Sequence, residues 1–185
     1  MTPPPRTVVV GVVPDQPSAV LAAAASFARG FDAEIVCAAV DVSRYGIGED
    51  ADGRVIAWPV DADLADEQVE EFDPALRDSI AAILDPIGVR WSTRALAGGA
   101  AQELSRLAEQ LDAAMIVVGT RERGMRGSLH ELLSGSVAVQ LAHRQHRPVV
   151  VIPLEPAGAG LELPWDGGTA TGDSTGTGES AGDAS

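Results

Sequence analysis

Residues 7–13, which read TVVVGVV, decide the fold of this chain. Nearly every residue of the stretch is β-branched, and no polar side chains alternate with the apolar ones. A continuous apolar run of this kind is typical of a strand buried on both faces, as in a parallel sheet covered by helices. The stretch therefore predicts an inner strand of an α/β domain.

Outward from this strand, the chain alternates between apolar runs and amphipathic helical segments. Strands separated by helices imply right-handed βαβ units. The sequence thus predicts one doubly wound, Rossmann-like domain: a five-stranded parallel sheet with helices on both faces. Periodicity alone leaves the strand order open, although the mixed composition of residues 89–96 favours an edge strand. The other strands are expected at 33–40, 114–119 and 148–152.

Composition divides the chain into three parts: a flexible N-terminus at 1–6, the domain at 7–154, and a tail at 155–185. The tail is acidic and rich in Gly, Ser and Thr, and such a segment buries too little apolar surface to fold. Inside the domain, residues 41–72 form a long acidic connection, in which VIAW at 55–58 could add a short ribbon. We interpret the acidic residues 61–71 as the solvated start of a helix.

Charge and composition exclude several classes of partner. The formal net charge is −14 and the 13 basic residues form no stripe, so we expect no nucleic acid partner. No apolar run is long enough to span a membrane, and the first residues, MTPPPR, lack the apolar core of a signal peptide. We therefore expect a cytoplasmic protein without a membrane partner. The single cysteine, Cys37, excludes an internal disulfide and suits a small core residue.

Three stretches in the second half resemble the C-terminal signature of the universal stress protein family: MIVVGTR at 115–121, GSV at 135–137 and HRPVVVIP at 146–153. VVVGV at 8–12 and GGA at 98–100 also match the places of that family's first strand and third helix. The resemblance covers about residues 7–154. It implies the strand order 3-2-1-4-5, a homodimer paired through the last strand and, as in many members, ATP bound at a glycine loop after the fourth strand.

Transferred to this chain, the family's nucleotide site falls on eight positions near the carboxyl ends of the strands. Glycines let the backbone approach a phosphate, and a helix N-terminus offers unpaired N–H groups to it. In α/β sheets, ligands bind at this edge. The eight candidate cofactor-binding positions are Val13, Ala39, Gly119, Arg121, Gly127, Gly135, Ser136 and Val137.

Two departures from the family pattern affect this site. ATP-binding members carry G-x2-G-x9-G-[S/T]. Here Gly119 and Gly135 match the two ends, but three extra residues lie between them. Glu122 stands at the second glycine, where its carboxylate would repel a triphosphate. Members usually also carry V-D-G-S after the first strand, with the aspartate holding the nucleoside, whereas residues 12–16 of this chain read VVPDQ.

Two functional hypotheses follow. The first is a homodimeric regulatory or binding module whose nucleotide site is altered or lost, and the second is an ATP-binding universal stress protein with slow ATP turnover. We favour the first, which is no enzyme, because the sequence shows no base, nucleophile or metal constellation. The histidines do not supply one: His143 and His146 have helical i, i+3 spacing near a predicted helix end, where the helix dipole accounts for them.

Overall fold

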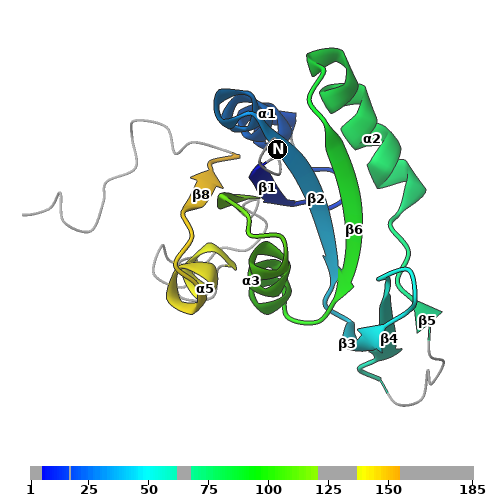
Figure 1. Cartoon of the computed structure of the whole chain (residues 1–185). Coiled ribbons are helices and arrows are strands. Elements are labelled where there is room, and N and C mark those ends of the chain that lie inside the picture. The colour runs from blue at the N-terminus through cyan, green and yellow to red at the C-terminus, as the bar shows by residue number, and fades with distance from the viewer. Residues whose placement is uncertain (1–5, 17, 62–67, 121–136, 155–185) are drawn as a thin grey trace, which may run out of the picture. The chain divides into compact units, whose positions relative to one another are not determined.

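The structure, a computed structural model, describes residues 6–16, 18–61, 68–120 and 137–154. Within these residues five parallel strands form one sheet in the order β6-β2-β1-β7-β8 (Figure 1). Counted along the chain, this is the order 3-2-1-4-5, so the predicted fold and strand order are confirmed, as is the edge position of the third strand. The strands are β1 (Arg6–Gly11), β2 (Ala33–Asp41), β6 (Trp91–Ala97), β7 (Met115–Gly119) and β8 (Val149–Ile152).

The central strand β1 supplies core residues to both faces of the sheet. Val8 and Val10 belong to one buried cluster and Val9 to the other, as expected from the alternation of side chains along a strand. All three valines are fully buried. Their β-branched side chains fill both sides of the strand, which explains why the sequence shows a continuous apolar run rather than an alternating one.

Helices cover the two faces in pairs (Figure 1). The helices α1 (Ser18–Phe31) and α2 (Pro74–Leu84) pack on the face of Val8, and α3 (Ala100–Gln110) and α5 (Val137–Arg144) pack on the face of Val9. The predicted cap of α2 is confirmed, because Asp73 Oδ1 accepts a hydrogen bond from Ala75 N at 2.8 Å. No helix in these described ranges is long and apolar enough to cross a lipid bilayer.

The long connection after β2 folds into a small antiparallel sheet of order β3-β4-β5, beyond the ends of β2 and β6 (Figure 1). Its strands are β3 (Arg44–Glu49), β4 (Val55–Pro59) and β5 (Gln68–Val69). The expected ribbon at 55–58 is therefore present as the middle strand. The predicted helix start is wrong for residues 68–71, because residues 68–69 pair with β4 and the following helix begins only at Pro74, whereas residues 62–67 lie outside the described residues. Pairing with a strand distant in sequence overrides the local acidic pattern.

An ion pair with little exposure to solvent joins the first strand of the small sheet to the residue that follows its last strand. Arg44 Nε lies 2.8 Å from Glu70 Oε1, and Arg44 Nη2 donates to Ala57 O at 2.8 Å. The two charged side chains are 16% and 11% exposed, so solvent screens this pair less than a surface pair. The arginine of β3 thus reaches across β4 to the residue that follows β5. The predicted tail at 155–185 and most of the predicted N-terminal segment lie outside the described residues, and these domain boundaries stay predictions.

Candidate ligand site at the carboxyl ends of the strands

The sheet has a topological switch point between β1 and β7. These strands are neighbours, with Val8 in register with Met115 and Val10 with Val117. The chain leaves β1 through α1 to reach β2 on one side, whereas the chain after β7 reaches β8 on the other side. The crossover helices α1 and α5 lie on opposite faces, so the connections diverge at the carboxyl ends of β1 and β7. Open α/β sheets bind their ligands in such a crevice.

Three of the predicted site residues lie along this edge. Val13 follows the end of β1 and is 57% exposed. Ala39 lies near the end of β2 and is partly buried, and a hydrogen bond of 2.9 Å from Val12 N to Ala38 O keeps the chain after β1 beside it. Gly119 is the last residue of β7.

A tight turn reverses the chain directly after β1. Gln16 N donates to Val13 O at 3.4 Å, Pro14 occupies the second position of the turn, and Asp15 occupies the third with φ of 57°. This pattern is that of a type II turn, which favours proline at the second position and glycine or asparagine at the third. Asp15 therefore holds a left-handed backbone, which aspartate tolerates better than most non-glycine residues and which Asp32 and Asp112 also adopt. The turn also explains why β1 ends at Gly11 and not at Val13.

The turn directs Gln16 back over the end of the sheet. Gln16 Nε2 donates weakly to Gly11 O at 3.5 Å. A Cβ on Gly119 would lie 3.1 Å from Gln16 Nε2, 3.1 Å from Val20 and 3.3 Å from Leu154. These distances are tighter than ordinary van der Waals contact, so packing under Gln16 is itself a reason for glycine at position 119. Approach to a phosphate, which the family pattern implies for Gly119, is therefore not the only reason for a glycine there, and the sequence pattern does not indicate Gln16.

The other end of the Gln16 carboxamide has no partner. Gln16 Oε1 is fully buried and accepts no hydrogen bond within the described part of the chain. A buried acceptor without a donor costs about 1–3 kcal/mol. An unsatisfied buried acceptor in a native structure needs an explanation, and one explanation is that a ligand donates a hydrogen bond to it. The sequence signal for this residue is slight: Pro-Asp marks a turn, and the polar side chain that follows it returns to the strand.

The chain beyond β7 is tied to the chain beyond β8. Thr120 N donates to Ile152 O at 2.9 Å, and Leu154 N donates to Thr120 Oγ1 at 2.9 Å. These bonds fix the first residue of the connection that should carry the phosphate loop. Val137 begins α5 and packs, partly buried, on the core of that face. The remaining predicted site residues lie outside the described ones: Arg121, Gly127, Gly135 and Ser136.

Other titratable groups lie away from this edge or serve the fold. Cys37 is fully buried in β2, and burial raises the pKa of its thiol to about 12, as suits the predicted core residue. His143 lies in the last turn of α5, as predicted. His146 lies beyond the end of that helix, so the predicted i, i+3 helical pair is wrong. Among the residues that the structure covers, no group of three His, Cys, Asp or Glu side chains could hold a metal ion.

Comparisons with known proteins agree with this architecture. A universal stress protein of Methanocaldococcus jannaschii is 35% identical over 130 residues, which is 70% of this chain and 70% of that protein. A universal stress protein solved in complex with cAMP has a TM-score of 0.53 at 20% identity, covering 81% of this chain and 98% of its own. One from Archaeoglobus fulgidus in complex with dAMP has a TM-score of 0.51 at 20% identity, covering 80% of this chain and 97% of its own.

The family model agrees over nearly the whole domain. The model of the universal stress protein family matches residues 5–153, which include all strands of both sheets and the turn that carries Gln16. The match spans more than half of the chain, and the signature stretches noted in the sequence lie within it. This chain therefore belongs to the universal stress protein family.

Proposed function

We propose that this protein is a regulatory module that binds an adenine nucleotide carrying one phosphate at the carboxyl ends of β1, β2 and β7. The observation that carries the proposal is the placement of Val13, Ala39 and Gly119 along one edge, at the switch point of the sheet. Universal stress proteins of the same fold have been solved with cAMP and with dAMP, which supports an adenine nucleotide here. The sequence shows no base, nucleophile or metal constellation, so the proposal is one of binding without turnover.

The proposed preference for one phosphate rests on the residues at which the chain departs from the ATP-binding pattern. Glu122 and the extra residues before Gly135 alter the part of the motif that would surround a triphosphate. A carboxylate near a chain of phosphates raises the energy of the bound state, and each further phosphate adds charge to the repulsion. The nucleoside half of the site depends on the strand ends, where Ala39 keeps its place beside the chain that leaves β1.

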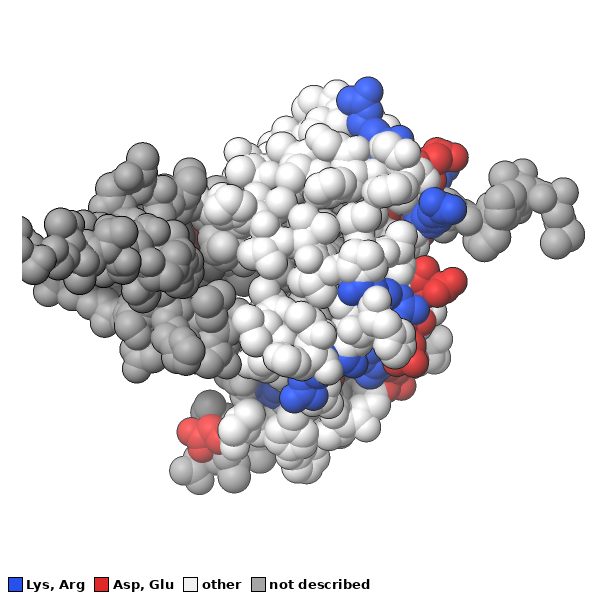
Figure 2. All heavy atoms as spheres, turned by 90° about the vertical axis from the view of Figure 1, so that its left-hand side faces the viewer, with Lys and Arg blue, Asp and Glu red and all other residues white. Residues whose placement is uncertain are grey.

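In this proposal the protein acts in the cytoplasm as a homodimer whose two copies pair through β8. This strand pairs with β7 on one side and is the last strand of the sheet on the other. Val151 of β8 is 43% exposed. Figure 2, which views the molecule from the β8 side, shows a broad uncharged surface in the described part of this face, with charged side chains along its border. An apolar edge strand tends to pair with another chain, and twofold pairing would cover it.

Isothermal titration calorimetry of the full chain with AMP, cAMP and ATP tests the proposal. We expect AMP or cAMP to bind with a dissociation constant on the order of micromolar, which corresponds to about 8 kcal/mol. ATP should bind more weakly than AMP. Absence of heat with all three nucleotides, together with no adenine nucleotide released from the denatured protein, would refute nucleotide binding. Tighter binding of ATP than of AMP would leave nucleotide binding intact and refute the preference for one phosphate.

A further inference from the structure

The unpaired carboxamide oxygen of Gln16 belongs to the same turn as Val13, the position at which the family pattern has lost its acceptor. Residues 12–16 read VVPDQ, and the position that usually holds an aspartate is occupied by Val13, whose side chain accepts no hydrogen bond. The turn at Pro14 and Asp15 returns the chain so that Gln16 lies over Gly11 and Gly119, the ends of the two strands at the switch point. A polar side chain thus re-enters the site from a different position in the sequence.

The orientation of the carboxamide is fixed by its neighbours. Nε2 lies 3.5 Å from Gly11 O, and a flipped amide would bring two oxygens together at this distance. The flipped state is therefore unfavourable, and the oxygen, not the nitrogen, is the atom without a partner. The group that completes Gln16 must donate a hydrogen bond.

The chemistry of nucleotides restricts which ligand group this donor can be. The phosphates of a nucleotide are ionised near neutral pH and act as acceptors. Its donors are the ribose hydroxyls and the exocyclic amine of adenine. We infer that Gln16 Oε1 is the specificity-determining acceptor of this site, which takes a hydrogen bond from the nucleoside half of the bound nucleotide. The inference rests on the proposed function, because it assigns a residue within the same site.

The strain around Gln16 agrees with this role. Asp15 adopts φ of 57° only because the turn requires it, and glycine would be the more relaxed choice. A strained turn and a buried acceptor without a donor both disfavour the ligand-free protein. Such a combination persists where it serves function at the expense of stability. Replacement of the carboxamide by an apolar group of the same length should therefore stabilise the free protein and weaken the complex.

The experiment is a double-mutant cycle in which one change removes the side-chain group of the protein and the other removes one donor group of the ligand. The variants are Gln16→Met, which keeps the length of the side chain and removes the carboxamide, and Gln110→Met, an exposed control at the end of α3. Calorimetry compares AMP with 2′-deoxy-AMP, 3′-deoxy-AMP and purine riboside monophosphate, each of which lacks one of the two ribose hydroxyls or the exocyclic amine. We expect the wild-type protein to bind one of these analogues roughly two- to tenfold more weakly than AMP, the range for a single neutral hydrogen bond.

Gln16→Met should bind AMP more weakly by a similar factor and lose its discrimination against that same analogue, because the two changes remove one interaction. Its thermal midpoint without ligand should rise by roughly 2–4 °C. Gln110→Met should behave like the wild type in both measurements.

Unchanged AMP affinity and discrimination in Gln16→Met would overturn this inference and leave the proposed function standing. A lower midpoint would also overturn it, because the carboxamide would then stabilise the fold. Failure of the wild type to bind AMP would overturn this inference, and the proposed function would fall with it only if cAMP and ATP also fail to bind and the denatured protein releases no adenine nucleotide.

Discussion

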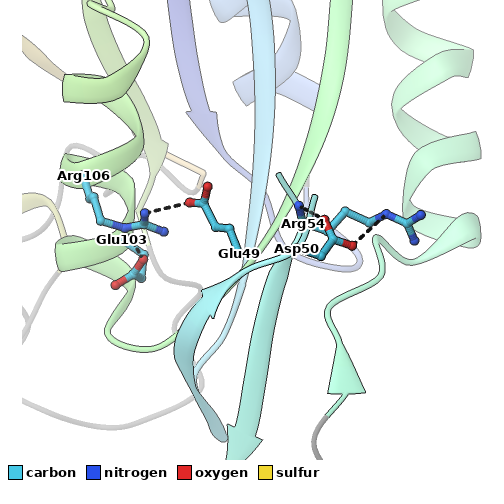
Figure 3. Close-up of polar contacts among 5 residues, drawn as sticks. All are labelled: Glu49, Asp50, Arg54, Glu103 and Arg106. Carbon is cyan, nitrogen blue, oxygen red and sulfur yellow. Dashed lines mark hydrogen bonds and ion pairs between the residues drawn. The ribbon is translucent and has the colours of Figure 1, made fainter. Parts of the chain in front are cut away.

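Arg106 of α3 and Glu49 of β3 form an ion pair across 57 positions of sequence, with Arg106 Nη1 3.0 Å from Glu49 Oε1 (Figure 3). Arg106 Nε also lies 3.0 Å from Glu103 Oε2 in the preceding turn of the same helix. Burial alone would lower the pKa of Arg106, but the hydrogen bonds to Glu49 and Glu103 raise it overall. The pair connects the small antiparallel sheet to the helix that follows β6.

This pair should contribute little to stability, because both side chains remain about two-fifths exposed. A double-mutant cycle with Glu49→Gln and Arg106→Gln should give a coupling energy of roughly 0.2–1 kcal/mol by urea unfolding. The matched control is the pair of Arg54 and Asp50 in the hairpin of β3 and β4, where the side-chain charges are farther apart, with Arg54 Nε 3.7 Å from Asp50 Oδ2 (Figure 3). The control pair should couple more weakly. A coupling well above the stated range for Glu49 would show that the small sheet depends on this contact.

Glu70 provides a prediction of pH dependence. Burial raises the pKa of its carboxyl in the folded protein, and the charge of Arg44 opposes this shift without cancelling it. The folded state therefore holds the Glu70 proton more tightly than the unfolded state. The ionised group costs stability at neutral pH, and this cost disappears as the pH falls through the folded pKa toward the unfolded one.

The measurement is urea unfolding of the wild type and of Glu70→Gln at about pH 7.5 and about pH 5. The free energy of unfolding of the wild type, relative to that of the variant, should increase at the lower pH. Glu71→Gln, at the exposed neighbouring position, is the matched control and should show a flatter difference. A decrease at the lower pH would contradict the prediction, because it would mean that the ion pair with Arg44 dominates over burial.

The sequence predicts the main sheet well because its signal is local. The valines of β1, β7 and β8 form continuous apolar runs, and the alternation with helices fixes parallel strands. The small sheet is harder to predict, because β5 consists of two residues and exists only through pairing with β4. The acidic residues around it carry a local pattern that favours a helix start, and the non-local pairing outweighs that pattern.

The site is predictable only in part for a similar reason. Val13, Ala39 and Gly119 follow from the strand ends, whose positions the apolar runs indicate. Gln16 depends on a turn in which an aspartate adopts the conformation usual for glycine. Pro14 and Asp15 mark a turn but do not specify the direction in which it returns the next side chain, so the contact of Gln16 with the sheet is visible only in three dimensions.

The proposed dimer leads to a prediction about β8. Val150 and Ile152 pack against the core, whereas Val151 is largely exposed and is the better position for a probe. Val151→Arg should convert the dimer into a monomer in sedimentation velocity, because a buried unpaired charge in a twofold interface is costly. The thermal unfolding of the variant should remain cooperative. Val60→Arg, at a more exposed valine directly after β4, should remain dimeric. A wild-type protein that sediments as a monomer at tens of micromolar would contradict the dimer.

The proposed tail leads to a prediction about truncation. Residues 155–185 are rich in Gly, Ser, Thr and Asp and follow the last strand of the sheet. Removal of everything after Pro156 should leave the midpoint and cooperativity of thermal unfolding nearly unchanged, because such a composition offers little apolar surface to bury. The difference in tryptophan fluorescence between the full and the truncated chain reports Trp165, and this difference signal should respond to a quencher as a free indole does. A loss of several kcal/mol on truncation would mean that the tail packs on the domain.

Positions 13 and 16 can each carry a hydrogen-bond acceptor for the nucleoside. Val13 is 57% exposed beside the end of β1, so an aspartate there would remain hydrated and would cost the fold little. Val13→Asp should restore the acceptor usual in the family, and a hydrogen bond to a charged group is worth about 1.5–3 kcal/mol, or roughly ten- to a hundredfold in affinity. Introduced into Gln16→Met, the same change should recover AMP binding by calorimetry, because either oxygen can serve the ligand donor. In the wild-type background the gain should be smaller, since Gln16 already satisfies that donor. Equal gains in the two backgrounds would mean that the two positions act on different groups, and the role assigned to Gln16 would then be wrong.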